Sequence, residues 1–421
     1  MQPPSAPRTK LDEAVFLTLV ALLPVMQPFS FQFGSYSIPL ADVVFLALVP
    51  AFLFAIVSGR RLIRISGWCW AVAAYGLAST LAAFGSGDRR TSLIKLAGIA
   101  YLCGLGILTT QYVNSMTMLR RTLAAWLVGT GLTVAAVFAG VVLFYAGVTG
   151  PSNIFLYSFG SLPPGAYPRV MGLFVNANML ATYVIAGVFL ILAMRRVEWV
   201  GARVGSVLMA GALLASALSL SPAIGGLVLG LCLWYAPRLS EQRLLAVGLR
   251  AAGWAAAILF VVAITVSPAA LVERSASGDW APRLEPSSRL QTWSGAWQTF
   301  VSHPWLGVGP GVDVTHVRYL NASGAIEQLT DAHNTWLSVL AQQGALGGIT
   351  FLVLTVWLLW PLKDASSFST HRLALFSGLA FAFAFGVLYP SLSGSFEDTR
   401  HTWVLMGLLA AVPRIPAEDR G

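Results

Sequence analysis

Long apolar stretches follow one another along almost the whole chain and are separated by short polar segments. A helix needs about 20 apolar residues to cross the hydrocarbon core of a membrane, so each stretch predicts one membrane-spanning helix. The seventh and eighth stretches are short and are joined by Ser219-Leu220-Ser221-Pro222, which predicts a tight helical hairpin. The fold expected is all-α, a polytopic integral membrane protein of about 12 transmembrane helices. The expected helices lie at 14–33, 38–57, 67–84, 92–110, 122–147, 171–194, 203–218, 221–236, 250–268, 335–360, 373–390 and 401–413.

One polar interval is much longer than the others and predicts a large periplasmic loop over residues 269–332. It separates transmembrane helices 1–9 (residues 1–268) from helices 10–12 and a cytoplasmic tail (residues 333–421). Within the loop, Pro286-Ser287-Ser288 predicts a helix start with Ser287 or Ser288 as N-cap. The residues after it predict an amphipathic helix at the outer membrane interface. Its apolar face would carry Leu290, Trp293, Trp297, Phe300 and Val301, opposite Gln291, Ser294 and Gln298.

Composition and charge support the membrane assignment and fix an orientation. The chain is 57% hydrophobic and 10% charged, whereas soluble domains carry about 25% charged residues. The net charge of +9 does not indicate a nucleic-acid partner, because the charges are scattered in short loops. With the N-terminus in the cytoplasm, 17 of the 26 Lys and Arg fall in cytoplasmic segments. This bias is the one that orients multi-pass membrane proteins, because Lys and Arg accumulate in cytoplasmic loops.

Positive residues on the opposite side do not set topology and therefore need another explanation. Arg289 opens the amphipathic helix, Arg169 precedes the sixth stretch, and Arg89, Arg90 and Lys95 surround the start of the fourth. The planar guanidinium group matches phosphate oxygens through paired hydrogen bonds. These residues are candidates for binding a phosphorylated substrate. The alternative for each is contact with the anionic headgroups of membrane lipids.

His333 lies where the large loop meets the next apolar stretch, in Asp331-Ala332-His333-Asn334. Histidine has an ordinary pKa near 6.5 and can accept a proton at neutral pH, which makes His333 a candidate general base. Below it, Gly344 and Gly347 continue the same helical stripe and predict close approach of another helix. The alternative is an interfacial histidine that only caps the helix or bonds to a neighbour.

The sequence indicates no cofactor and no metal. No cluster of carboxylates and no metal-like spacing of histidines accompanies His333. A metal-independent site follows as a hypothesis, in which arginines stabilise the charge of a phosphate leaving group.

His333-Asn334, nine residues and Gly344-Ala345-Leu346-Gly347 resemble the His-[Asn/Ser/Gln]-x9-Gly-x-x-Gly pattern of bacterial O-antigen ligases. O-antigen polymerases and bacterial O-linked oligosaccharyltransferases carry similar patterns. The segment from Arg289 to Gly311, with its tryptophans and His-Pro-Trp-Leu-Gly-Val-Gly-Pro-Gly, resembles the region upstream of that pattern. Arg169 with Gly172, Phe174, Asn176 and Asn178 resembles the mid-chain signature of the same superfamily. One departure is Ser221-Pro222-Ala223, where many relatives have a Ser-Arg-Gly-like sequence.

The resemblance implies glycan transfer at the periplasmic face of the inner membrane, from a glycan on undecaprenyl pyrophosphate to a sugar hydroxyl. His333 and Arg289 would be the catalytic residues. Arg169, Arg89, Arg90, Lys95, Asn178, Asn334 and Asp331 would bind substrate. In an O-antigen ligase the acceptor is the lipid A-core, and in a polymerase it is another lipid-linked glycan. Both readings stay open at this point, as do a protein oligosaccharyltransferase and a membrane transporter, although no matching Gly/Pro-broken spans indicate transport.

Overall fold

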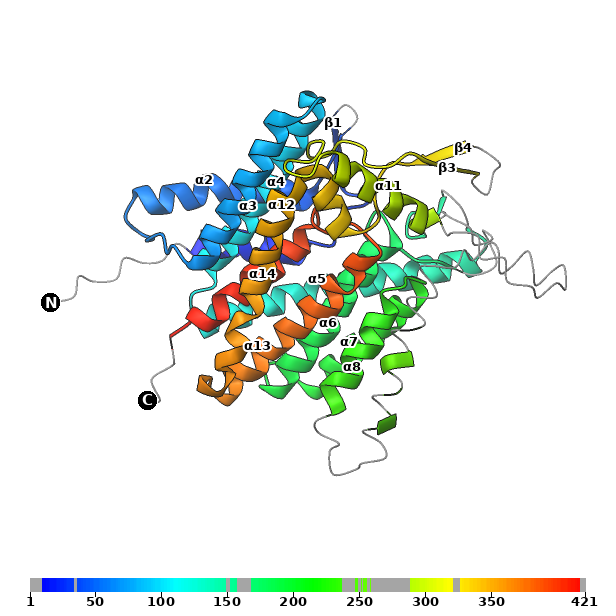
Figure 1. Cartoon of the computed structure of the whole chain (residues 1–421). Coiled ribbons are helices and arrows are strands. Elements are labelled where there is room, and N and C mark those ends of the chain that lie inside the picture. The colour runs from blue at the N-terminus through cyan, green and yellow to red at the C-terminus, as the bar shows by residue number, and fades with distance from the viewer. Residues whose placement is uncertain are drawn as a thin grey trace.

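The computed structural model describes residues 10–33, 36–148, 152–156, 168–236, scattered positions between 247 and 258, 288–320 and 326–416. These residues form a mostly helical bundle with two small β-hairpins (Figure 1). The hairpins are a correction to the all-α prediction. One of them, β3–β4, lies inside the segment predicted as the large loop.

The first half of the chain forms five helices and one hairpin. Ser66, Asp88 and Ser115 are the N-caps of the third, fourth and fifth helices, because each side chain accepts a hydrogen bond from a backbone N–H of the first turn. The elements are α1 (Lys10–Leu22), β1 (Ser30–Phe33), β2 (Tyr36–Pro39), α2 (Leu40–Val57), α3 (Gly67–Gly85), α4 (Arg89–Tyr112) and α5 (Met116–Tyr145).

The second half contains the remaining helices and the second hairpin. The described elements are α6 (Ala177–Arg196), α7 (Ala202–Leu218), α8 (Ile224–Tyr235), α11 (Ser288–Ser302), β3 (Val317–Leu320), β4 (Ile326–Leu329), α12 (Thr335–Leu359), α13 (Thr370–Phe383) and α14 (Arg400–Ala411). A π-helical turn at Ala384–Leu388 and short 3₁₀ segments at Trp360–Ser367, Pro390–Leu392 and Val412–Arg414 complete it.

Within the described residues, seven helices are long and apolar enough to cross a membrane, so the chain is a multi-pass membrane protein. These spans are Leu40–Val57, Gly67–Gly85, Arg89–Tyr112, Met116–Tyr145, Ala177–Arg196, Thr335–Lys363 and Thr370–Leu392. The apolar helices α7 and α8 are shorter and follow one another through the turn predicted at Ser219–Pro222, and the predicted packing of the two as a tight hairpin stays a prediction. The ninth predicted span, 250–268, lies almost wholly outside the described residues, and the total of twelve stays a prediction.

Two predicted boundaries are wrong for local reasons. The span predicted at 14–33 ends as a helix at Leu22, because Pro24 and Pro28 interrupt the apolar run, and β1 follows. The span predicted from 171 begins at Ala177, because Gly172 has φ 57° in a turn and Asn176 caps the helix through Met179 N.

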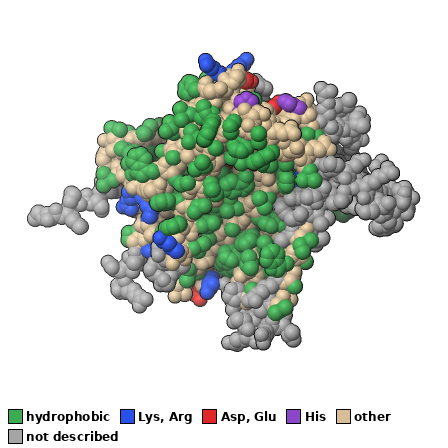
Figure 2. All heavy atoms as spheres, in the orientation of Figure 1, with side chains coloured by type: hydrophobic (Ala, Val, Ile, Leu, Met, Phe, Trp, Pro, Cys, Tyr) green, Lys and Arg blue, Asp and Glu red, His purple; other side chains and the backbone are tan. Residues whose placement is uncertain are grey.

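The bundle is held together by long helix pairs. α3 packs against α12, α4 against α14, and α6 against both α7 and α13. α6 is the most deeply buried of the seven spans. Figure 2 shows hydrophobic side chains over the middle of one face. Lys and Arg lie toward both ends of that face, and His lies near the upper end. The end that carries α11, β3–β4 and the start of α12 is called the loop end below.

The charge bias predicts that both chain termini lie in the cytoplasm. A reporter that works only in the cytoplasm is expected to be active when it is fused after Arg420. A reporter that works only in the periplasm is expected to be inactive there. The matched control is the same reporter inserted between Ser323 and Gly324, in the loop predicted to be periplasmic. Periplasmic activity of the fusion after Arg420 would contradict the predicted topology.

Candidate functional site

Helix α11 places Arg289 beside the segment that carries His333. The Thr292 hydroxyl lies 2.8 Å from the carbonyl oxygen of Arg289 and 3.3 Å from that of Ala332, within donating reach of both. One turn later, Ala296 packs in a small apolar cluster with Val314, Ala332 and Ala341. The predicted helix is therefore confirmed, but its inner face is made of small residues. Trp297 and Val301, predicted to lie on its apolar face, are exposed.

His333 is held in an unusual backbone conformation by Asp331. Its φ is 48°, in the left-handed region that few non-glycine residues adopt. The backbone N–H of His333 donates to Oδ2 of Asp331 at 3.2 Å, and the imidazole Nδ1 lies 3.5 Å from the same oxygen. Ser338 and Ser395 also donate to this carboxylate, at 3.0 and 2.8 Å. Asp331 therefore fixes both the backbone and the ring of His333.

Asn334 is the N-cap of α12. Its side-chain oxygen accepts hydrogen bonds from Trp336 N and Leu337 N, at 3.0 and 3.1 Å. Its amide donates to the carbonyl oxygen of Leu392 at 3.2 Å. These bonds connect the start of α12 to the segment before α14, so Asn334 holds the turn in which His333 is presented.

Arg289 lies within electrostatic range of both His333 and Arg169. Burial lowers the pKa of His333 below 6.5; Asp331 opposes this shift, and Arg289 adds to it. Burial also lowers the pKa of Arg289, and the charge of Arg169 contributes in the same direction. The segments that carry Arg169, Arg289 and His333 are far apart in sequence, yet their charges act on one another. His333 is therefore expected to be neutral, and able to accept a proton, at neutral pH.

Several buried polar atoms lack a hydrogen-bond partner among the described residues. Among them are Nη1 of Arg289 and the side-chain oxygen of Asn178. A buried donor without a partner costs free energy, so such groups call for a ligand or water to complete them. The unpartnered Nη1 makes Arg289 the strongest candidate for an anion donor in the described part of the chain.

Arg169 reaches the turn where the resemblance leads one to expect an arginine. Its Nε donates to the carbonyl oxygen of Ser219 at 3.2 Å, and the neighbouring Val170 N donates to Leu218 O at 3.1 Å. This turn joins α7 to α8 and continues into Ser221-Pro222-Ala223. A guanidinium group is thus present beside that sequence, supplied by a different part of the chain.

Lys95 lies beside a group of acidic residues that the sequence analysis did not single out as a site. Its Nζ forms an ion pair with Asp398, in the segment before α14. The Oε2 atom of the neighbouring Glu397 is buried and has no hydrogen-bond partner among the described residues. Burial, followed by the charges of Asp398 and Asp331, raises the pKa of Glu397. The structure therefore brings Lys95, Glu397 and Asp398 within electrostatic reach of Asp331.

Arg89 and Arg90 lie in the first turn of α4 and are exposed. They precede Lys95 by about 8 Å along the helix axis. Asp88 caps this turn through Thr91, and Arg90 is one of the groups that lower the pKa of Asp88. No hydrogen bond or ion pair joins either arginine to His333 within the described residues, so their part in substrate binding stays a prediction.

Glycines of the Gly307–Gly311 run and of the Gly344–Gly347 motif lie where the loop after α11 packs against α12. Gly344 has φ 64° and interrupts α12, and a side chain there would meet the backbone of Trp305 at 2.3 Å. The loop after α11 pairs with this break: Val308 N donates to Ala341 O at 3.0 Å and Ala345 N to Pro304 O at 2.7 Å. Gly344 therefore admits a loop, a contact that the sequence did not predict, while α3 packs against α12 as a neighbouring helix. The Gly307–Gly311 run has a packing role here.

No three of the His, Cys, Asp and Glu residues in the described part of the chain are grouped so as to hold a metal ion. The charges within the site come from Arg169, Arg289 and Lys95 on one side and from carboxylates on the other. That the reaction needs no metal stays a prediction.

Together, the fold and the site describe a multi-pass membrane protein with a histidine–arginine cluster at the loop end of its helices. Residues 181–352 match the family model described as O-antigen ligase. This match confirms the resemblance to the O-antigen ligase superfamily and includes Arg289, Asp331, His333 and both glycines of the motif. The family indicates a membrane enzyme that processes glycans, of the ligase or polymerase type. A search of curated proteins finds no significant match.

A general base at His333 has a definite pH signature. Activity is expected to be complete at neutral pH and to fall as pH drops through the lowered pKa of His333, where the imidazole becomes protonated. In Asp331→Asn the attraction that raises this pKa is lost, so the acid limb should move to lower pH while the maximal rate falls. The measurement is initial transfer rate over pH 4.5–8.5 for both proteins. A shift to higher pH in Asp331→Asn would contradict this assignment.

Proposed function

We propose that the protein transfers a glycan from undecaprenyl pyrophosphate to a sugar hydroxyl, at the periplasmic face of the inner membrane. The supporting observation is the convergence of His333, Asp331, Arg289 and Arg169 at the loop end, inside or next to the family match. A pyrophosphate leaving group needs cations, and an acceptor hydroxyl needs a base. The cluster offers both at the end of membrane-spanning helices, where a polyprenyl donor is accessible from the lipid.

In this mechanism Arg289 and Arg169 bind the pyrophosphate oxygens. Nη1 of Arg289, which has no partner among the described residues, would donate to a pyrophosphate oxygen. Asp331 stands beside Nδ1 of His333, so Nε2 is the atom that accepts the proton of the acceptor hydroxyl. The acceptor oxygen then forms a bond to the anomeric carbon, and the bond from that carbon to the pyrophosphate oxygen breaks. Undecaprenyl pyrophosphate leaves with its negative charge held by the arginines.

The acceptor that we propose is the lipid A-core, which makes the protein an O-antigen ligase. The family model that matches the chain carries that description. A polymerase of O-antigen or exopolysaccharide is the alternative, because the same cluster would serve a second lipid-linked glycan as acceptor.

Competing acceptors separate the two functions. Purified protein is supplied with one undecaprenyl-pyrophosphate glycan and either lipid A-core or more of the same donor. We expect glycosylated lipid A-core as the product, and no elongated donor. Elongation of the donor in the absence of lipid A-core would establish the polymerase instead. Transfer to neither acceptor, with the donor moved across the membrane of a liposome, would favour a transporter.

A further inference from the structure

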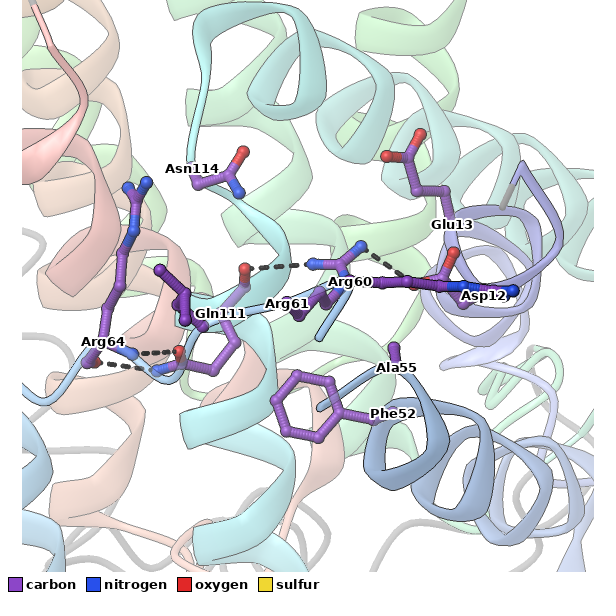
Figure 3. Close-up of a pocket in the computed structure, with 10 residues that line it drawn as sticks. Asp12, Glu13, Phe52, Ala55, Arg60, Arg61, Arg64, Gln111 and Asn114 are labelled. Carbon is purple, nitrogen blue, oxygen red and sulfur yellow. Dashed lines mark hydrogen bonds and ion pairs between the residues drawn. The ribbon is translucent and has the colours of Figure 1, made fainter. Parts of the chain in front are cut away.

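A polar cavity lies at the far end of α4 from the candidate active site. Its volume is about 210 Å³. Lys95 and Gln111 stand near opposite ends of this membrane-spanning helix, about 24 Å apart along its axis. The cavity is therefore separated from His333 by most of the membrane thickness. Its polar lining comes from α1, the connection between α2 and α3, and the end of α4 with the residues after it (Figure 3). These polar residues are Asp12, Glu13, Arg60, Arg61, Arg64, Gln111 and Asn114.

The walls of this cavity are fixed by internal hydrogen bonds. Arg64 N donates to the Gln111 side-chain oxygen at 2.9 Å, and Gln111 Nε2 donates to Arg64 O at 3.0 Å. Arg61 donates through Nε to Asp12 at 3.0 Å and lies over the ring of Tyr112 at 4.1 Å. Figure 3 shows the hydrogen bonds of Arg61 and Arg64 as dashed lines. The connection between α2 and α3 is therefore held in one arrangement.

Two arginines of the lining, Arg60 and Arg64, are not paired with a carboxylate among the described residues. Arg61 is paired with Asp12, and the other acidic residue of the lining, Glu13, is paired with Arg121 at 3.5 Å. Neither Arg60 nor Arg64 forms an ion pair in the part of the chain that the structure describes. A smaller neighbouring cavity, of about 130 Å³, shares Arg64 and Asn114 with the first and adds Arg414. The linings of these two neighbouring cavities therefore carry excess positive charge that suits an anion.

The surroundings of the cavity point to a lipid as the source of that anion. Three large apolar side chains next to these arginines in sequence are exposed. Leu62 is 86% exposed, Ile63 58% and Ile65 66%. Large apolar side chains exposed next to guanidinium groups match the boundary between lipid headgroups and acyl chains. The positive-inside bias explains arginines in this connection, but it does not require a cavity with fixed walls.

We propose that this cavity binds the phosphate group of an anionic membrane phospholipid, with Arg60 and Arg64 as the donors. The site is independent of the glycan-transfer chemistry at the loop end. It would place one lipid molecule against α1, α2 and α4 and so couple the stability of this corner of the bundle to anionic lipid.

The test compares two double variants of the purified, delipidated protein. Arg60→Gln/Arg64→Gln removes both donors, which are exposed and support no described fold contact through an ion pair. Arg195→Gln/Arg196→Gln is the matched control, since these two exposed arginines end α6, on the side also predicted to be cytoplasmic, and line neither cavity. The probes are dioctanoyl phosphatidylglycerol, dioctanoyl phosphatidylcholine and inorganic phosphate. The readouts are lipid retention in native mass spectrometry and the shift in thermal unfolding midpoint.

We expect phosphatidylglycerol to bind and stabilise the wild type and the control. The Kd for it should rise about tenfold or more in Arg60→Gln/Arg64→Gln. Equal weakening in both double variants would overturn the proposal, because it would show a general effect of charge. Unchanged binding in the cavity variant would overturn it as well. Stabilisation by inorganic phosphate equal to that by phosphatidylglycerol would overturn the lipid as the source and assign the cavity to free phosphate.

Discussion

Replacing His333 is expected to abolish most glycan transfer while leaving the protein folded and inserted. Loss of a positioned general base costs about 10²–10⁴-fold in rate. Loss of a purely structural side chain at a helix start costs about 1 kcal/mol of stability and leaves activity proportional to the amount of folded protein. Since Asn334 already caps α12, removal of the imidazole should not unravel the helix. The measurement is transfer rate per folded molecule in His333→Ala.

The backbone at His333 calls for a second variant. With φ at 48°, alanine is strained at this position, whereas asparagine tolerates the left-handed region. His333→Asn therefore keeps the conformation and removes the base. His303→Ala is the matched control, because His303 is exposed at the other end of α11. Inactive His333→Asn with normal thermal stability, beside an active control, would establish the chemical role. Normal activity in His333→Asn would reject it.

Replacing Arg289 by lysine is expected to cause the second large loss of glycan-transfer activity, although the positive charge is kept. Lysine offers a point charge and cannot present the paired donors of a guanidinium group to a pyrophosphate. We expect transfer to fall about 10²-fold or more, the scale of losing one donor that stabilises developing charge. The KM for the lipid-linked donor should rise as well, because Arg289 binds the ground-state pyrophosphate too.

A control and a second readout make the Arg289 prediction specific. Arg203→Lys, at an exposed position in α7, should leave the rate unchanged. In Arg289→Gln the charge that lowers the pKa of His333 is absent, so the acid limb of the residual activity should move to higher pH. Near-normal transfer in Arg289→Lys would indicate that Arg289 contacts lipid headgroups only. Arg169→Lys should follow Arg289→Lys in the same direction.

Much of the helical fold could be predicted from apolar length and capping residues. The stretches at 38–57 and 67–84 correspond closely to α2 and α3, because proline, serine and charged residues delimit them. The prediction is wrong where an apolar run contains prolines, as before β1. It also missed the break at Gly344, since an isolated glycine in an apolar stretch does not reveal that a loop packs against it.

The candidate site could be predicted residue by residue but not as a network. Arg169, Arg289 and His333 stand out because charged or titratable groups are unexpected at the ends of apolar helices. The roles of Ser395, Glu397 and Asp398 depend on contacts between the segment before α14 and residues far away in sequence. The acidic pair next to Arg400 was the available signal, but sequence spacing alone did not connect it to Asp331.

The most direct test of the proposed function is a stoichiometric transfer reaction with purified components and no divalent metal ions. The protein is mixed with an undecaprenyl-pyrophosphate glycan and lipid A-core, and glycosylated product and released undecaprenyl pyrophosphate are both quantified. We predict equal amounts of the two from the wild type and almost none of either from His333→Asn. Transfer that persists in His333→Asn, or that occurs only after a metal ion is added, would contradict the mechanism.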